Sequence, residues 1–394
     1  MKPPPKINFY RHISLPIASF KYYHMWFYIP YSKKSIMFWL SVLTKIVLGL
    51  LVFAIPVGGE IAYVVKLIAS GKAEIQEVAA IANLVLTELT ACFKLLDLRL
   101  RRGHLKRLMD QLITEETQYD HVEHIAIQQR AARMSRYLFI GLLLMCLADI
   151  TVHSVVVPAI RGFQELPLKM DLLFFDISEE PYFKYICVYQ VRNRSLFLLS
   201  CVIFLFDEYL LVLIGQLDVL LYNFKKVDSL IKQEQLKKKC SEDDAFNQVF
   251  IKLLGHHQKI KRFVQKMQLA FSGLLFLEMA IVIGIVGLTA IQMLSIEITI
   301  KNITDLFWVV MFLFIEVGML FVTCYLGHMI TAKSHQISTV AFQCPWLDRS
   351  LRLKKNLIIF ITQTQQPLAL VAAGLIPVSF ETFTKVLHTR WCWR

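Results

Sequence analysis

The stretch LAFSGLLFLEMAIVIGIVGLTAIQML, residues Leu269–Leu294, decides the fold class of this 394-residue chain. Glu278 is its single ionisable side chain. The hydrocarbon core of a bilayer is about 30 Å thick and needs roughly 20 consecutive apolar residues of helix, a length that this stretch exceeds. The stretch therefore predicts a helix that spans a membrane.

Six further apolar stretches of similar length divide the rest of the chain. They lie at Ile36–Pro56, Ile75–Leu96, Tyr137–Ile160, Leu196–Gly215, Leu306–Ile330 and Asn356–Val386. Apolar residues make up 56% of the chain and its mean hydropathy is +0.51, which argues for one polytopic bundle and against two soluble domains. We expect an all-α membrane protein with seven transmembrane helices.

The distribution of Lys and Arg predicts the orientation of these helices. Of the 43 basic residues, 31 precede the first span or follow the second, fourth and sixth spans, and ten lie on the opposite side. By the positive-inside rule, the N-terminus is cytosolic and the C-terminus extracellular. The glycosylation patterns at Asn193 and Asn302 both fall on the predicted outer side. The net charge of +13 then indicates contact with anionic membrane lipid, with no nucleic acid partner.

Apolar residues continue with helical spacing beyond the predicted inner edge of the membrane. The repeat runs from Leu210 to Phe224, is interrupted by the polar stretch Gln233–Asp244, and resumes in Ala245–Met267. Half-apolar helices in water need a partner, so these extensions predict packing surfaces between helices or subunits. On the other side of the membrane, the loop Arg161–Gln190 is long enough to act as a lid over the outer mouth.

Ionisable residues inside the spans are costly to bury and by default mark functional positions. For Glu88, Asp207 and Glu208 we expect pairing with Lys45 or hydrogen bonds shared inside the bundle.

Glu381 and Lys385 lie four residues apart on the last span, the spacing at which an ion pair forms on one face of a helix. Both are tolerated there if that helix lines a path filled with water.

No catalytic motif is present in the sequence. There is no H-E-x-x-H, no G-x-S-x-G and no Gly-rich phosphate loop, so we expect no enzyme activity and no catalytic residues. Cys/His pairs at metal-ligand spacing are missing too, so neither a metal nor another cofactor is expected. We interpret the neighbouring His256 and His257 as part of a solvated helix face.

Three short motifs near the end of the chain occur in a characteristic order and spacing. They are Cys344-Pro345-Trp346, Gln365-Gln366-Pro367 and the run from Pro377 to Phe383, PVSFETF. In these motifs the chain resembles the insect odorant receptor family. Weaker similarity in the outer loop and around His256 extends the resemblance over roughly the second half of the chain.

The resemblance implies an odorant-gated, non-selective cation channel in the plasma membrane of sensory neurons. Members form heterotetramers of a tuning subunit with a common co-receptor subunit. Odorants bind in the outer half of each bundle, helices 4 to 7 project into a cytosolic anchor, and the last helix lines the pore after a break, here at Ala372-Ala373-Gly374. The long inner loop of the co-receptor is missing, so this chain resembles a tuning subunit.

Three regions follow from this reading. Residues 1–35 form a cytosolic N-terminal segment. Residues 36–332 hold the first six helices, with the ligand-binding bundle and the cytosolic extensions. Residues 333–394 hold the cytosolic and pore-lining parts of the last helix.

A volatile odorant offers few hydrogen bonds, so its site is expected to be a mostly apolar cavity. The candidate ligand-binding residues are Val78, Ile81, Val85, Cys146, Ile150, His153, Phe197, Cys201, Phe204, Phe307 and Met311. For each of them, plain packing inside the bundle is the alternative interpretation. The candidate pore-lining residues are Ser379, Thr382, Phe383 and Val386.

Three alternatives share parts of this pattern. A G-protein-coupled receptor has the opposite orientation, and neither a D-R-Y run nor an N-P-x-x-Y run exists here. A gustatory-type chemoreceptor channel has the same topology, but the signature of that family in the last span is not found. A secondary transporter is expected to show an internal repeat, and none is convincing here. One departure from the odorant receptor pattern is the ending Thr389–Arg394, where the family usually continues into an aromatic and aliphatic tail.

Overall fold

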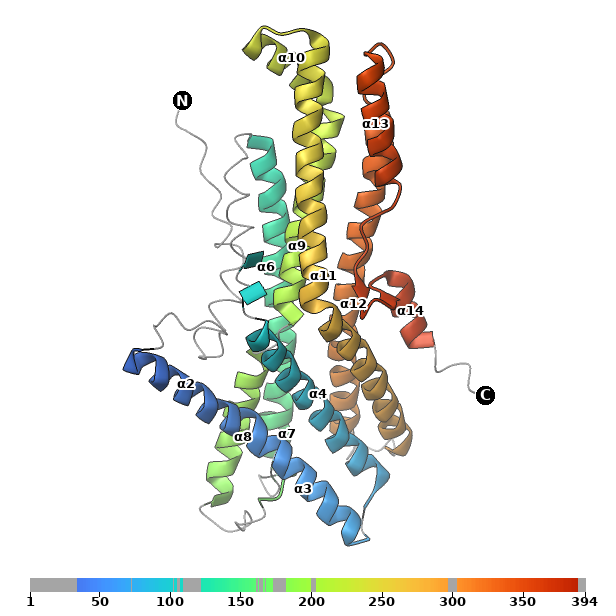
Figure 1. Ribbon diagram of the computed structural model, residues 1–394. Helices are drawn as coiled ribbons and strands as arrows, with labels where there is room; N and C mark the ends of the chain where they lie inside the picture. Colours follow the sequence, from blue (N-terminus) through green and yellow to red (C-terminus); the bar gives the residue numbers. More distant parts are fainter. Residues whose placement is uncertain are drawn as a thin grey trace.

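The computed structural model of the protein describes residues 34–71, 73–101, 103–104, 107–108, 122–160, 162, 166, 168–172, 182–199, 203–296 and 303–388. Nearly all of these residues are helical, and one two-stranded sheet lies among them. Figure 1 shows an elongated bundle with α10 (Val227–Lys238) and α13 (Leu351–Thr364) at one end and α3 (Ile55–Ala69) near the other. The predicted all-α class is confirmed, with one short hairpin that the apolar pattern did not predict.

The first predicted span forms a helix from its first residue. α2 (Ile36–Gly49) begins after Ser35, whose Oγ accepts a hydrogen bond from the backbone N–H of Met37 at 3.3 Å. The π-helical turn η2 (Leu50–Ala54) and then α3 continue the helix without a break. The helix is therefore longer than the predicted span, which ended at Pro56.

Spans two to four also lie in helices. They correspond to α4 (Ile75–Leu100), to α6 (Val122–Thr151) with η4 (Val152–Val156) and α7 (Val157–Ile160), and to the end of α8 (Tyr182–Leu199) with the start of α9 (Ile203–Lys225). Residues 200–202, inside the fourth predicted span, lie outside the described residues.

The fifth and sixth spans lie in helices much longer than a bilayer is thick. α11 (Glu242–Ser295) has 54 residues and α12 (Ile303–Phe342) has 40. At 1.5 Å per residue, α11 is about 80 Å long, more than twice the roughly 30 Å of a hydrocarbon core. Much of α11 therefore extends beyond any membrane that it crosses, as the helical repeat predicted. α12 runs straight through residue 332, so the region boundary expected there does not coincide with the end of a helix.

Four helical stretches in the described part of the chain are long and apolar enough to cross a membrane. They are Ile75–Lys94, Glu123–Val156, Glu242–Ser295 and Ile303–Phe342. The chain therefore has the apolar helices of a multi-pass membrane protein.

The seventh predicted span, Asn356–Val386, is wrong as a single helix. α13 ends at Thr364, a hairpin of β1 (Val371–Ala372) and β2 (Ile376–Pro377) follows, and α14 is the short helix Phe380–His388. Pro367 biases the residue before it away from helix, and a proline inside a helix removes a backbone hydrogen bond. The turn of the hairpin has positive φ at Ala373 (50°) and Gly374 (71°). The break predicted at this turn is confirmed, but it extends over residues 365–379.

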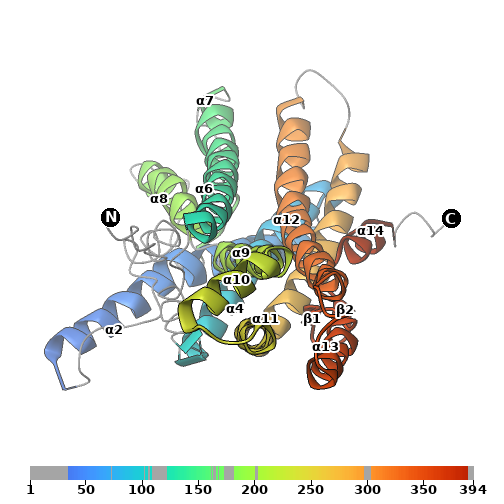
Figure 2. The same ribbon diagram turned by 90° about the horizontal axis from the view of Figure 1, so that it is seen from above.

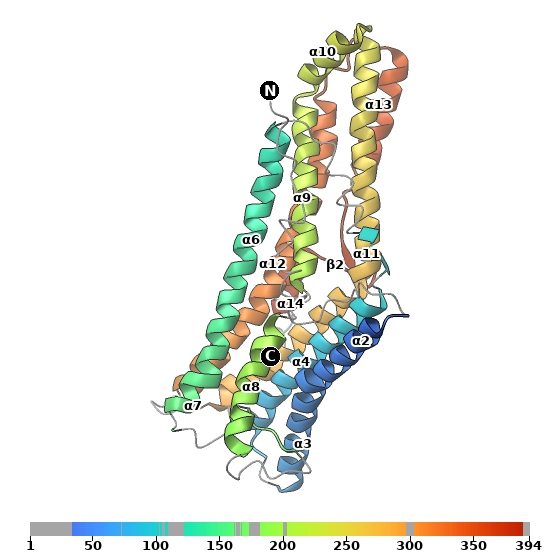
Figure 3. The ribbon, with the colours of Figure 1, turned by 90° about the vertical axis from the view of Figure 1, so that its left-hand side faces the viewer.

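The main hydrophobic core is built around α9. Leu210, Leu217 and Phe224 are almost fully buried, as the helical repeat predicted. Viewed from above in Figure 2, α9 lies near the centre, with α6, α11 and α12 around it and in contact with it. Figure 3 shows α6, α9 and α11 running side by side along the bundle. This core runs from α10 and α13 to α14.

Candidate ligand site and pore segment

The candidate ligand residues whose side chains are described lie on α4, α6 and α12. Ile81, Cys146 and Ile150 are buried, Val78, Val85 and Met311 are half-buried, and Phe307 is 52% exposed. Cys146 belongs to a small apolar cluster in which Phe139 and Leu142 of α6 meet Ile315 and Met319 of α12. The structure thus places one candidate position directly at a contact between α6 and α12.

The remaining candidates cannot be placed at side-chain level. His153, Phe197, Phe204 and the predicted glycosylation residue Asn193 belong to described helices, but their side chains lie outside the described part of the structure. Cys201 and Asn302 lie outside the described residues altogether, as does the divergent ending Thr389–Arg394.

A polar pair inside the predicted outer half was missed by sequence reasoning. The amide of Asn83 on α4 donates a hydrogen bond from Nδ2 to Oγ1 of Thr289 on α11 at 3.1 Å, and both residues are fully buried. An asparagine near the middle of an apolar helix was the available signal. The pair ties α4 to α11 close to Ile81 and Val85 in the sequence.

Part of the long outer loop lies across α3 and α4. The backbone N–H of Asp171 donates to the carbonyl oxygen of Gly59 at 2.9 Å, and its carboxylate binds Lys66 at 2.6 Å. Beside it, Lys169 binds Glu77 at 2.7 Å. The described part of the loop is thus fastened to α3 and to the first turn of α4, and its role as a lid stays a prediction.

Three polar contacts connect the middle portions of five helices. Asp207 on α9 accepts a hydrogen bond from Thr323 on α12 at 2.9 Å, and Glu208 accepts one from Ser135 on α6. The predicted hydrogen bonds of Asp207 and Glu208 inside the bundle are confirmed. A buried ion pair between Lys94 on α4 and Glu278 on α11 was not predicted. These contacts tie α9 to α12 and α6, and α4 to α11.

The candidate pore residues lie at the start of α14 and pack against α12. Ser379 Oγ accepts a hydrogen bond from the backbone N–H of Thr382 at 3.2 Å, and Thr382 Oγ1 donates to the carbonyl oxygen of Pro377 at 2.6 Å. The ring of Phe383 lies 5.2 Å from that of Phe321 on α12, centroid to centroid. Thr382 and Phe383 are therefore buried within this chain, and Val386 is half-buried.

The opposite face of α14 is charged and exposed. Lys385 Nζ lies 2.6 Å from Glu381 Oε1, and these side chains are 72% and 74% exposed. The ion pair predicted from their spacing is confirmed.

The interpretation of His256 and His257 as a solvated helix face is wrong. His257 is buried with its ring edge-on to Phe360 of α13, at 5.3 Å between centroids, and His256 makes a hydrogen bond to Gln216 Oε1 at 2.9 Å. Burial lowers the pKa of each imidazole to about 4, so both are neutral at pH 7. These histidines are packing residues between α11 and its neighbours α13 and α9.

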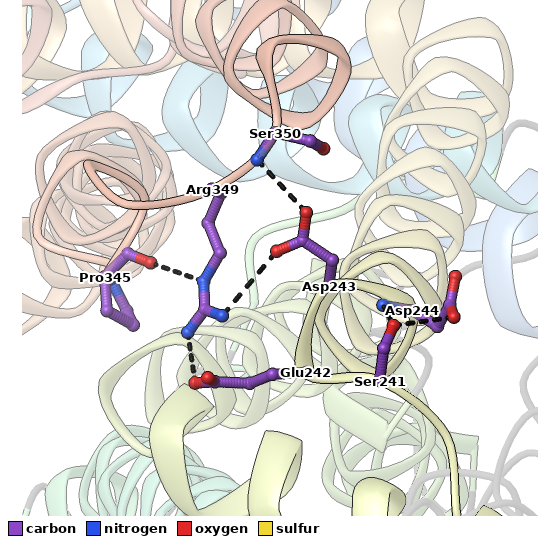
Figure 4. A network of polar contacts seen from close by, with 7 residues as sticks. All are labelled: Ser241, Glu242, Asp243, Asp244, Pro345, Arg349 and Ser350. Carbon is purple, nitrogen blue, oxygen red and sulfur yellow. Dashed lines mark hydrogen bonds and ion pairs between the residues drawn. The ribbon is translucent and has the colours of Figure 1, made fainter.

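A polar network closes the end of the molecule where α11 begins (Figure 4). Arg349, in the turn between α12 and α13, binds Glu242 and approaches Asp243 at 3.7 Å, while the backbone N–H of Ser350 donates to Asp243 at 3.1 Å. The hydrogen bond to Glu242 raises the pKa of the guanidinium further. The network fixes the turn to the first residues of α11, and no sequence motif predicted it.

Comparison with known proteins gives a consistent result. The model of the 7tm odorant receptor family matches residues 75–390. The chain is 27% identical over 158 residues to odorant receptor 22a of Drosophila melanogaster, covering 39% of this chain and 38% of that protein. It is 22% identical over 244 residues to odorant receptor 10 of Aedes albopictus, covering 61% and 62%. The matched segments thus span less than two thirds of either relative.

The fold is also similar to a solved structure. The olfactory receptor OR5 of Machilis hrabei superposes with a TM-score of 0.73 at 12% identity, covering 97% of each chain. The same receptor in complex with eugenol gives a TM-score of 0.73 at 12% identity, covering 96% of this chain and 95% of that one. At this level of identity the likeness establishes a common fold.

Proposed function

Because the chain belongs to the insect odorant receptor family, we propose that it is the odorant-binding subunit of an odorant-gated, non-selective cation channel. In this proposal it binds a small volatile molecule within the outer half of its bundle, and binding opens a pore bordered by α14. Its place is the plasma membrane of sensory neurons, in a heterotetramer with a co-receptor subunit. Asn193 and Asn302 are its proposed glycosylation sites.

The observation that carries the proposal is the position of α12 between the two sites. On this helix Ile315 and Met319 contact the cluster around Cys146, and Phe321, two residues beyond Met319, packs on Phe383 of α14. A ligand that rearranges α6 against α12 therefore acts on the same stretch of helix that supports the pore segment. Two sites joined by one rigid element can be coupled through it.

The ligand site is proposed to be apolar with few polar groups. It comprises the candidate residues on α4, α6, α8, α9 and α12, of which Ile81, Cys146 and Ile150 are buried. Sites of this kind suit a volatile compound, whose orientation is set by one or two hydrogen bonds. An odorant opens the channel only to the extent that it binds the open arrangement more tightly than the closed one.

The pore segment is proposed to be Ser379, Thr382, Phe383 and Val386 together with the exposed face of α14. Glu381 and Lys385 on that face are compatible with a wet path and incompatible with lipid, where charged side chains are costly. Phe383 packs on Phe321 of α12, and the buried Thr382 donates a hydrogen bond to the carbonyl oxygen of Pro377.

Expression in oocytes together with an insect co-receptor subunit tests the proposal. An odorant panel is expected to evoke inward cation currents that are absent with the co-receptor alone. Full surface labelling of both subunits with no response to a broad panel would count against the proposal. Odorant uptake without current would indicate a transporter instead.

A further inference from the structure

The linker between α13 and α14, residues 365–379, is held to α11 by the side chain of Gln268, which binds both the backbone N–H and the carbonyl oxygen of Val371. Gln268 Oε1 accepts a hydrogen bond from the N–H of Val371 at 2.9 Å, and its Nε2 donates to the carbonyl oxygen of Val371. Ser272, one turn further along α11, donates to the same oxygen at 3.1 Å, and its own carbonyl oxygen accepts from the N–H of Ala373 at 3.1 Å. The side-chain amide of Gln268 thus forms with strand β1 the hydrogen bonds that the backbone of an adjacent strand would form.

The same linker is fixed to α12 on its other side. The backbone N–H of Leu368 donates to Ser334 Oγ at 2.8 Å. Further on, Gly327 lies so close to Val378 that a Cβ at this glycine would collide with the carbonyl oxygen of Val378. In Figure 3 the strand labelled β2 lies between α11 and α12. The linker is therefore held between two long helices.

The hairpin cannot hold its own position. Each strand has two residues, and a short two-stranded hairpin is at best marginally stable by itself. Its position, and hence the start of α14 three residues after the end of β2, depends on the contacts with α11 and α12. Among the described contacts between the linker and α11, those of Gln268 bind both the backbone N–H and the carbonyl oxygen of Val371.

We infer that Gln268 is a positioning residue that transmits the movement of α11 to the pore segment. α11 is joined to α4 at its outer end through Thr289 and Asn83, and to the linker through Gln268. A shift of α11 relative to α12 therefore pulls on Val371 and reorients α14. The inference rests on the proposed channel function and assigns a role to a residue that does not touch the odorant.

Three substitutions on the same helix separate this role from a general effect. Gln268→Leu removes both hydrogen bonds to Val371 at similar side-chain size. Gln265→Leu, on the exposed face of α11 about one turn earlier, is the matched control. Gln268→Glu keeps the acceptor for the N–H of Val371 and loses the donor to its carbonyl oxygen.

The expected result is a loss of coupling with retained binding. In oocytes with the co-receptor, Gln268→Leu lowers the maximal odorant-evoked current per surface receptor by at least about fivefold, the lower end of typical allosteric coupling. Odorant affinity of the purified receptor stays unchanged, Gln268→Glu gives an intermediate current, and Gln265→Leu behaves as wild type. A wild-type current from Gln268→Leu overturns the inference. If that variant does not reach the surface, a wild-type current from Gln268→Glu overturns it instead.

Amide hydrogen exchange of the purified chain separates this inference from the proposed function. Exchange at Val371 and Ala373 is expected to be faster in Gln268→Leu than in Gln265→Leu, whether or not the protein conducts ions. Equal exchange in the two variants would show that Gln268 does not hold the linker. Absence of odorant-evoked current from the wild type would contradict the proposed function and leave the exchange result standing.

Discussion

The predicted cytosolic extension and the predicted outer half of the bundle are packed in different ways. In the extension, Phe360 of α13 lies among Phe224, Phe250 and His257, with ring centroids 5.6, 5.7 and 5.3 Å away, inside one continuous core that reaches α14. In the outer half, the described apolar residues form two small separate clusters, one around Cys146 and one around Trp308. Close-packed cores resist continuous deformation, whereas small clusters joined by single polar contacts can rearrange at lower cost.

Because of this difference, we assign different roles to the two regions. The extension gives the subunit a fixed frame that holds α11, α12 and α13 in register. In the proposed mechanism, the outer half adapts to a ligand and passes the change along α11 and α12 to the pore segment.

Phe360→Ala should have the largest effect. The side chain is 2% exposed, and removing a buried phenylalanine typically costs about 3–5 kcal/mol. The thermal transition of the purified receptor, followed by size-exclusion chromatography after heating, should move to a clearly lower temperature. Phe307→Ala, at a position that is 52% exposed, is the control and should leave the transition in place. Equal shifts of the transition temperature in the two variants would contradict the difference in packing between the extension and the outer half.

Asn83→Leu should destabilise the outer half by a smaller amount. It leaves the buried hydroxyl of Thr289 without its partner, and an unsatisfied buried polar group costs about 1–3 kcal/mol. The double substitution with Thr289→Val should recover most of this loss, because both polar groups are then gone. Unfolding of the four proteins forms a double-mutant cycle. Additive losses would mean that the two side chains do not interact.

Arg349→Gln should loosen the turn between α12 and α13 by less than Asn83→Leu destabilises the bundle. Its partner Glu242 is 58% exposed, so solvent screens much of the attraction. Amide exchange at Ser350, whose N–H binds Asp243, is the sensitive measurement and should become faster. Arg352→Gln on the first turn of α13 serves as the control. An unchanged rate at Ser350 would show that Arg349 does not hold this turn.

Lys169→Gln should have the smallest effect on stability, below about 1 kcal/mol, because its ion pair with Glu77 is partly exposed. If the outer loop acts as a lid, odorant-evoked currents should rise faster after application in this variant. The difference should shrink at high ionic strength, since salt already weakens the pair in the wild type. Identical rise times at low salt would argue against a lid.

The long helices could be predicted from the sequence because apolar runs of fixed length and a period near 3.6 residues report them directly. The linker before α14 could not be predicted in this way. Residues 367–379 are mostly apolar, and apolar composition alone does not distinguish an extended segment from a helix. Pro367, Pro377 and Gly374 were the available signals, and they located only the turn.

The side-chain environment of the site was harder to predict than its helices. His257 is buried by Phe360, which lies more than a hundred positions further along the chain, and Lys94 meets Glu278 from another helix. Such pairs depend on tertiary packing, which no local pattern encodes. Burial of Ile81, Cys146 and Ile150 agrees with a place inside the bundle, and their contact with an odorant stays a prediction.

Amide hydrogen exchange of the receptor and co-receptor complex, with and without an activating odorant, tests the central claim most directly. The claim is that ligand binding rearranges the outer half and the linker while the cytosolic extension stays fixed. The odorant should change exchange in the outer parts of α4 and α6 and at residues 368–378, and leave the amides around Phe224, Phe250 and Phe360 unchanged. A change centred on those core amides, with none in the linker, would contradict it.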